Sequence, residues 1–213
     1  MSIAYRLRPL LARFPPLLNA AEVVRWRMTR PSIPAGQDLR LHLGCGDIDY
    51  PGFVNIDGRP APHVHRLQRI DKLDAFADQS ASLIYACHCL EHFGFRQVPL
   101  VMKEWRRVLK PGGIVRISVP DFDHLVNLYL ESGRDVQSII QPLMGGQDYA
   151  FNFHYTCFNR TDLSRLLVEA GFRNPREWHP GTDTYTSVPD WSGKTIPYRG
   201  REYPVSLNVE ADG

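Results

Sequence analysis

Long apolar runs, a disulfide pattern and a strong charge imbalance are all absent from this sequence. No apolar stretch approaches the roughly 20 residues that cross a bilayer, and the first residues lack the uninterrupted apolar segment of a signal peptide. The four cysteines show no disulfide-framework spacing, and the net charge is only +2. These absences favour a cytoplasmic protein with reduced thiols and give no reason to expect a nucleic-acid partner.

The length and composition fit one globular domain with a short N-terminal arm. The chain has 213 residues, 43% apolar and 23% charged, which suffices for a sizeable core. In the first thirty residues only Glu22 opposes a set of arginines: Arg6, Arg8, Arg13, Arg25, Arg27 and Arg30. Apolar residues recur opposite them at helical spacing until Pro15-Pro16 ends the pattern: Ile3, Leu7, Leu10, Leu11 and Phe14. We therefore predict a basic amphipathic arm over residues 1–35 and a folded domain over residues 36–213.

The arm has two interpretations. It is either a helix packed on the domain or a weak peripheral anchor to anionic lipid, at the inner membrane face, or to a membrane-bound partner. Pro31 and Pro34 fit a linker between the arm and the domain.

Strands and helices alternate along the folded domain. The predicted strands cover residues 39–43, 53–56, 63–67, 83–87, 114–119, 172–179 and 205–209. The predicted helices cover residues 98–109, 122–132, 135–142 and 163–170. Pro111-Gly112-Gly113 stops the first helix and Gly171 stops the last. This alternation predicts an α/β fold with a mostly parallel sheet and crossover helices.

A glycine turn, Leu43-Gly44-Cys45-Gly46-Asp47, follows the first predicted strand and lets a ligand approach the backbone closely. The dinucleotide fingerprint fails, because its third glycine would fall on Asp49. Carboxylates beside the turn would also repel a pyrophosphate, whereas they suit S-adenosylmethionine, which carries a sulfonium and an ammonium instead of phosphate.

Asp57 ends the second predicted strand, where an acidic side chain can accept hydrogen bonds from both ribose hydroxyls. Only eleven positions separate Gly46 from Asp57, and Pro51-Gly52 interrupts them. Since a full crossover needs a dozen or more residues, we expect the first helix to be reduced to a turn.

Five segments then stand in order: LHLGCG (41–46), GFVNID (52–57), LEHF (90–93), EWRRVLKPGG (104–113) and SVPDF (118–122). With them the chain resembles the class I S-adenosylmethionine-dependent methyltransferases of the ubiquinone-biosynthesis-like, or type 11, group. Within that group it is similar to small members often associated with bacterial surface-polysaccharide and sugar modification. The similarity covers residues 39–211, including GQDY (146–149), NFHY (152–155) and SLNVEA (206–211). One departure is Ser82, where the family usually has Asp at the start of the fourth strand.

The resemblance implies a Rossmann-like fold with a seven-stranded, mostly parallel sheet of order 3-2-1-4-5-7-6, the seventh strand antiparallel, and helices on both faces. It implies S-adenosyl-L-methionine as the cofactor. Gly44 and Gly46 would line its methionine part, Asp57 would hold the ribose, and two residues at the end of the fourth strand would flank it. The cofactor-binding residues expected in this way are Leu43, Gly44, Cys45, Gly46, Asp57, Gly58, Cys87 and His88.

Two metal patterns compete with this interpretation. His88-x-x-Glu91-His92 matches the inverted zinc-peptidase motif, but that chemistry needs both histidines on one helical face, and His88 falls where a strand ends. Cys87 and Cys89, with Cys157 and His154, could be imagined as a further metal site, although alternate residues of a strand point to opposite faces. We therefore expect packing thiols and no metal ion.

Transfer of a methyl group to a hydroxyl acceptor needs a base that removes the hydroxyl proton. Near neutral pH this base is most economically a histidine. The candidate catalytic residues are His154, Tyr155, Asp121 and His88. His154 and Tyr155 lie in an aromatic insert before the last helix, and the alternative for His154 is a histidine hydrogen-bonded inside its own loop. Asp121 follows the fifth strand, where capping the next helix is the alternative role.

The expected function is O-methylation of a sugar, a glycan or another small hydroxyl acceptor, with an amine as a further possibility. The alternatives are an inactive binding or scaffold protein with a methyltransferase fold and, as a minor one, a zinc hydrolase. The sequence leaves open the acceptor, the choice between His154 and His88, the oligomeric state and the role of the arm.

Overall fold

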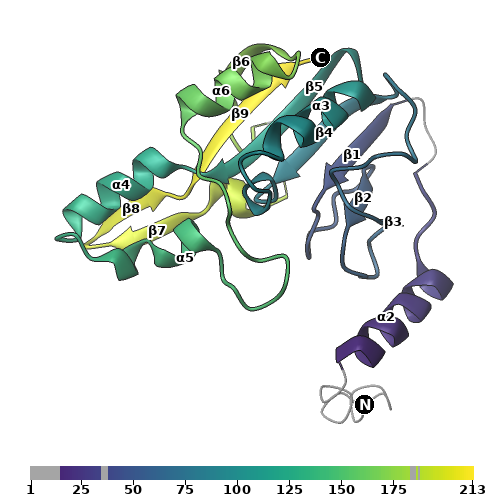
Figure 1. Ribbon diagram of the computed structural model, residues 1–213, viewed down its shortest axis with the longest axis horizontal. Coiled ribbons are helices and arrows are strands. Elements are labelled where there is room, and N and C mark those ends of the chain that lie inside the picture. Colours follow the sequence, from purple (N-terminus) through teal and green to yellow (C-terminus); the bar gives the residue numbers. More distant parts are fainter. Residues whose placement is uncertain (1–14, 35–37, 183–185, 187) are drawn as a thin grey trace.

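The computed structural model describes residues 15–34, 38–182, 186 and 188–213, and its centre is one twisted sheet (Figure 1). Seven strands follow the order β3-β2-β1-β4-β5-β9-β6. The strands are β1 (Leu39–Leu43), β2 (Val54–Asp57), β3 (Arg66–Leu67), β4 (Ala81–Cys87), β5 (Leu109–Pro120), β6 (Arg173–Glu177) and β9 (Ser206–Asp212). The first five pair in parallel, and β9 runs antiparallel to both of its neighbours. The predicted fold and strand order are confirmed, with β9 as the seventh strand of the sheet.

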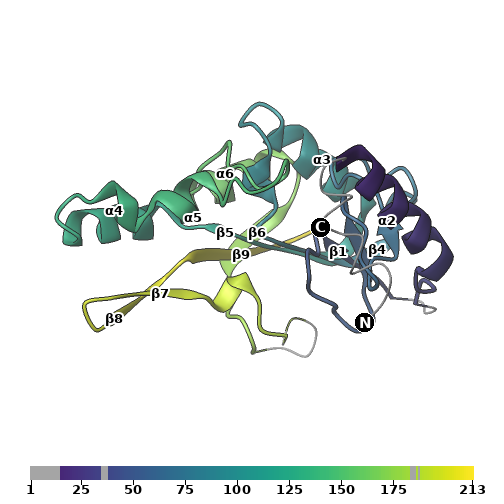
Figure 2. The same ribbon diagram turned by 90° about the horizontal axis from the view of Figure 1, so that it is seen from below.

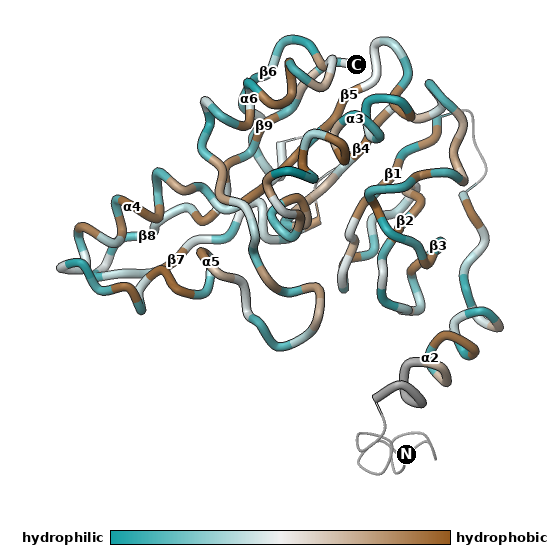
Figure 3. Tube along the Cα trace, in the orientation of Figure 1, coloured by the Kyte–Doolittle hydropathy of each residue, from teal (hydrophilic) through white to brown (hydrophobic). Residues whose placement is uncertain are grey.

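One face of the sheet is covered by helices α3 (Val98–Val108) and α6 (Arg160–Glu169) (Figure 2). The central strands β4 and β5 are predominantly hydrophobic, as Figure 3 shows, because both of their faces are buried. Trp105 of α3 is fully buried, and its indole Nε1 donates to the Ile70 carbonyl at 2.8 Å. This bond ties α3 to the loop that follows β3.

The opposite face is covered by aromatic side chains from loops. Leu83 and Tyr85 of β4 point to this face, whereas Ile84 and Ala86 belong to the core under the helices. The loop cluster contains Tyr50, Phe53 and Trp178. No helix stands between β1 and β2, as the short spacing predicts, so these rings fill the space of the usual first crossover helix.

A lobe beyond the sheet is built from α4 (Phe122–Glu131), α5 (Ile140–Met144), β7 (Thr195–Tyr198) and β8 (Arg201–Pro204) (Figure 1). The sequence analysis did not predict the hairpin β7–β8. Its two-residue turn, Arg199-Gly200, has positive φ at both positions, as in the turns that favour hairpins. The predicted helix over 135–142 is instead a 3-10 turn, η2 (Val136–Ser138), followed by α5.

The structure describes the N-terminal arm from Pro15 on. Pro15 and Pro16 are the first described residues of helix α2 (Pro15–Thr29), and the fixed φ of proline is compatible with a first helical turn. Ile3, Leu7, Leu10, Leu11 and Phe14 lie outside the described residues. Trp26 of α2 is buried against Cys45 and Val64, and its Nε1 donates to the Val64 carbonyl at 2.6 Å. Among the described residues, no helix has the length and apolarity that crossing a membrane requires.

Candidate active site

A cavity of about 1140 Å³ opens beyond the carboxyl ends of β1, β2 and β4, where ligands bind in folds of this type. It runs from the glycine turn to α5 and the β7–β8 hairpin. The structure brings most of the predicted site residues to it: Gly44, Cys45, Gly46, Asp57, Gly58, Cys87, His88, His154 and Tyr155. Leu43 and Asp121 do not line it. The Leu43 side chain lies in the core, and the Asp121 carboxylate caps α4 by accepting from the Asp123 and His124 backbone N–H groups.

Both glycines of the turn have positive φ, +62° at Gly44 and +53° at Gly46. A Cβ on Gly44 would lie 2.7 Å from the Cβ of Cys89, so this position is closed by packing. A Cβ on Gly46 would meet no atom within 4 Å, so the backbone there is open to a ligand. The turn therefore has one glycine for the protein's own packing and one that leaves room above the chain.

Asp57 connects this turn to β2. Its Oδ2 accepts from the Gly46 N–H at 2.8 Å, and its Oδ1 accepts from the Arg59 N–H at 2.7 Å. The side chain is 12% exposed, and each carboxylate oxygen has a further lone pair for a ligand hydroxyl. Beside it, the Arg59 guanidinium lies over the Tyr149 ring at 4.4 Å from the ring centroid.

Of the three cysteines that line the cavity, Cys45 and Cys89 are buried and Cys87 is half-buried. Burial raises the pKa of Cys45, Cys87 and Cys89 above the ordinary thiol value, which keeps them protonated at neutral pH. The Cys89 Sγ donates to the Leu43 carbonyl at 3.5 Å. Cys157 is exposed.

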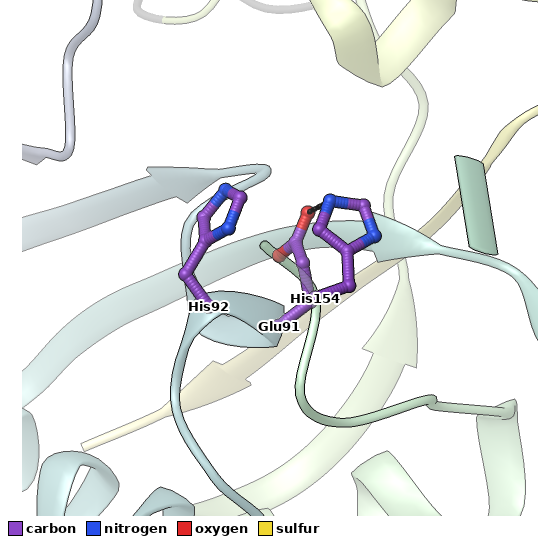
Figure 4. A group of neighbouring side chains, drawn as sticks. All are labelled: Glu91, His92 and His154. Carbon is purple, nitrogen blue, oxygen red and sulfur yellow. Dashed lines mark ion pairs between the residues drawn. The ribbon is translucent and has the colours of Figure 1, made fainter. Parts of the chain in front are cut away.

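A buried carboxylate, that of Glu91, lies between the imidazoles of His92 and His154 (Figure 4), and it also contacts His88. Glu91 of η1 (Leu90–His92) is fully buried, with Oε1 at 3.3 Å from His88 Nδ1 and 3.9 Å from His154 Nε2. Burial favours the neutral acid, but the contact with His88 and the charges of all three histidines outweigh it, so the pKa of Glu91 lies below its ordinary value. The carboxylate is therefore held ionised by its imidazole neighbours, which include His92.

The ring nitrogens of these histidines differ in what they already contact. Both nitrogens of His92 face backbone carbonyls, those of Phe153 at 3.0 Å and His88 at 3.2 Å. The Nε2–H of His88 donates to Ser206 Oγ at 2.7 Å, since that hydroxyl itself donates to the Trp191 carbonyl, while Nδ1 pairs with Glu91.

His154 differs from the other two. Its Nδ1–H donates to the Pro142 carbonyl at 3.0 Å, which leaves Nε2 without a hydrogen bond. Burial lowers the pKa of His154, against the opposing charge of Glu91, so the ring is neutral near pH 7. His154 thus combines the loop hydrogen bond of the alternative interpretation with a free ring nitrogen in the cavity wall.

The structure does not support the zinc-peptidase motif, but it does bring three possible metal ligands close together. His88 follows β4 with a φ of +50°, and η1 is a single 3-10 turn, so His88 and His92 do not share an α-helical face. Ligand atoms of Glu91, His92 and His154 do lie within 4.8 Å of one another. Both nitrogens of His92 already face a carbonyl oxygen at hydrogen-bond distance, so neither is directed at an open metal position.

Three residues at the far end of the cavity were not singled out in the sequence: Asp190, Trp191 and Lys194. They belong to η3 (Trp191–Gly193) and its flanks. Their only sequence signal is an Asp-Trp-Ser turn, which carries no periodicity.

The sheet order is that of the Rossmann-like methyltransferase fold, and the comparisons agree with this fold. Residues 51–117, less than half of the chain, match the family model described as "Methyltransferase domain". Over the full length of both chains, the structure is similar to a SAM-dependent methyltransferase from Archaeoglobus fulgidus, with a TM-score of 0.51 and 13% identity. No curated protein matches the sequence significantly.

Two further solved structures share the fold. A SAM-dependent methyltransferase from Methanosarcina mazei has a TM-score of 0.51 at 15% identity, over 84% of this chain and 94% of the other. The 1,6-didemethyltoxoflavin-N1-methyltransferase of Burkholderia thailandensis, with bound 1,6-didemethyltoxoflavin and S-adenosylhomocysteine, has a TM-score of 0.50 at 17% identity, over 94% and 81%. At such identities the likeness establishes the fold.

Alanine substitutions at the two turn glycines should separate packing from backbone conformation. Gly46→Ala should cost about 1 kcal/mol of unfolding free energy, for a side chain in the left-handed region. Gly44→Ala should lower the unfolding free energy by roughly 1–3 kcal/mol more than Gly46→Ala does, because the added Cβ would overlap Cys89. Denaturant unfolding measures both. Equal losses in the two variants would contradict the assignment of Gly44 to packing.

Proposed function

We propose that this protein is an S-adenosylmethionine-dependent methyltransferase. The observation that carries the proposal is the open turn at Gly46, held by Asp57 at the carboxyl ends of β1 and β2. The space above Gly46 suits a ligand in close contact with the backbone, and the free lone pairs of Asp57 suit the ribose hydroxyls. The match of residues 51–117 to a methyltransferase domain supports the same cofactor. The predicted residues that line this end of the cavity would hold it, while Leu43 would support the turn from the core.

Asp57→Ala should weaken binding of S-adenosylhomocysteine by about 1.5–3 kcal/mol, roughly 10- to 150-fold in Kd, because it removes charged acceptors of hydrogen bonds. Isothermal titration calorimetry measures the affinity. Asp38→Ala is the matched control, since Asp38 is exposed, pairs with Lys110 and lies outside the cavity. Unchanged affinity in Asp57→Ala would show that the ribose binds elsewhere.

The proposed reaction is methyl transfer to an acceptor hydroxyl, with His154 as the base. When bound, the cofactor supplies a methyl group on a sulfonium. His154 Nε2 would take the proton of the acceptor hydroxyl and so make its oxygen a nucleophile for that methyl group. Tyr155, which is exposed in the cavity wall, would orient the acceptor. Glu91 would stabilise the protonated imidazole through its carboxylate, 3.9 Å from Nε2.

His154→Ala and His154→Gln should each lower turnover by about 10²–10⁴, the usual contribution of general acid–base catalysis, with S-adenosylhomocysteine affinity little changed. Turnover of the wild type should fall only as the pH drops below 6.5, because a base works when deprotonated and burial lowers this pKa from 6.5. Methylated product is followed by mass spectrometry over a panel of hydroxyl acceptors. Activity that survives in both variants and is lost in His88→Ala would move the base to the end of β4.

We propose that the transfer needs no metal ion, on the basis of the carbonyl contacts of both His92 nitrogens. Stoichiometric zinc in elemental analysis, together with turnover lost to a chelator, would overturn this and favour Glu91, His92 and His154 as ligands. For Asp121 we propose the helix-capping role instead of a catalytic one, because both backbone N–H groups that it binds belong to α4.

The proposed acceptor is a hydroxyl of a sugar or glycan, ahead of an amine or another small metabolite. The aromatic insert around His154 and the polar groups of the lobe support a ring with several hydroxyls. An inactive scaffold would bind S-adenosylhomocysteine and yet methylate no member of such a panel.

For residues 1–35 we propose peripheral docking to an anionic membrane surface or to a partner there. Helix α2 exposes Val24 and Met28 among Arg25, Arg27 and Arg30. Removing residues 1–14 should reduce sedimentation with phosphatidylglycerol vesicles and leave S-adenosylhomocysteine affinity intact, because Trp26 still packs on the domain. Phosphatidylcholine vesicles are the control. Equal sedimentation of both forms would exclude the docking role of those residues.

A further inference from the structure

The segment between β6 and β7 is fastened to the sheet through Asp190. The Asp190 Oδ2 accepts from the hydroxyls of Tyr50 at 2.9 Å and Tyr85 at 2.5 Å. Its Oδ1 accepts from the backbone N–H of Ser192 at 2.8 Å and so caps η3. A buried carboxylate with four donors, the Ser192 hydroxyl among them, fixes this turn to the aromatic cluster under the sheet.

Trp191 follows directly and is held through its backbone, not through its ring. Its carbonyl accepts from Ser206 Oγ at 2.7 Å and from the Lys194 N–H at 3.1 Å. The side chain, by contrast, is 53% exposed and lines the cavity. The other three tryptophans of the chain are at most 8% exposed. A rigidly mounted indole with a free surface in a polar cavity is suited to stacking on a ligand ring.

The indole lies beside His88, whose Nδ1 contacts Glu91. Its ring centroid is 5.9 Å from that of His88, and Ser206 links the two residues through hydrogen bonds. Gln137 and Gln141 line the same cavity, and their side-chain amides have no hydrogen-bond partner in the described part of the chain. Such amides suit ligand hydroxyls.

A positive charge adjoins the same ring. The Lys194 Nζ lies 5.9 Å from the Trp191 ring centroid, and no carboxylate of the described residues pairs with it. The other cations that line the cavity, Arg59 and Arg69, both have aspartate partners at the cofactor end. A ligand stacked on Trp191 would therefore meet an unneutralised ammonium.

We propose that Trp191 and Lys194 form the acceptor subsite and that the acceptor is a hydroxylated ring with an anionic substituent. The ring stacks on the indole, and its carboxylate or phosphate pairs with Lys194. This inference rests on the proposed function and narrows it from hydroxyl compounds in general to acidic or phosphorylated sugars.

Fluorescence quenching tests the subsite without turnover, because acrylamide reaches the exposed Trp191 in preference to the three buried indoles. The full chain is saturated with S-adenosylhomocysteine and titrated with glucuronic acid, glucose 1-phosphate or the neutral methyl glucoside. The difference between wild type and Trp191→Phe isolates the Trp191 emission. We expect at least one anionic sugar to reduce acrylamide quenching of Trp191, and the two anionic sugars together distinguish carboxylate from phosphate.

Lys194 variants test the charge. Lys194→Gln should raise the Kd of the protecting anionic sugar about tenfold, as expected for loss of a charged partner, and Lys194→Arg should restore most of the affinity. Equal protection by the neutral glucoside, or an unaltered Kd in Lys194→Gln, would overturn the anionic assignment. Absence of protection by all three sugars while S-adenosylhomocysteine binds would overturn the subsite alone. Absence of S-adenosylhomocysteine binding would overturn the proposed function and this inference with it.

Discussion

One hydrogen bond, from the Gly46 N–H to the Asp57 carboxylate, organises the ligand-binding end of this protein. It joins the turn after β1 to the last residue of β2, and the Cys45 N–H to Ile56 carbonyl bond at 3.1 Å extends the pairing by one step. With this link in place, the chain passes from one strand to its parallel neighbour without a crossover helix. The face that such a helix would have covered is filled by Tyr50 and other rings of the loop cluster.

The aromatic rings that stand in place of this helix also position residues at the other end of the cavity. Tyr50 and Tyr85 present their hydroxyls to Asp190, and Asp190 caps the turn that carries Trp191. The proposed cofactor end and the proposed acceptor end are therefore connected through one buried aromatic layer. A substitution in the loop after β1 would displace η3, because closely packed protein interiors transmit small displacements.

Glu91 is a second buried carboxylate that neighbouring side chains surround, as the tyrosines surround Asp190; here the neighbours are three histidines. A fully buried carboxylate without a hydrogen-bond donor of its own is costly unless cations or partial positive charges surround it, and three imidazoles do so here. Two of those imidazoles use both ring nitrogens in contacts with the protein. The remaining one, His154, keeps Nε2 free, and this difference in hydrogen bonding, more than proximity, favours it as the base.

The sequence by itself determined the layered α/β fold, the reduced first crossover and the glycine turn with Asp57, whereas the strand order was implied by the family resemblance. The first three features follow from local patterns: apolar runs at strand length, glycines at a tight turn, and a spacing too short for a helix. The tertiary structure decided what no local pattern encodes. The hairpin β7–β8 and the α4–α5 lobe are stabilised by contacts with each other, and Asp190 meets its tyrosine partners across more than a hundred residues. The site residues at the far end of the cavity depend on such long-range contacts, and for that reason only the folded chain brings Trp191 beside His88.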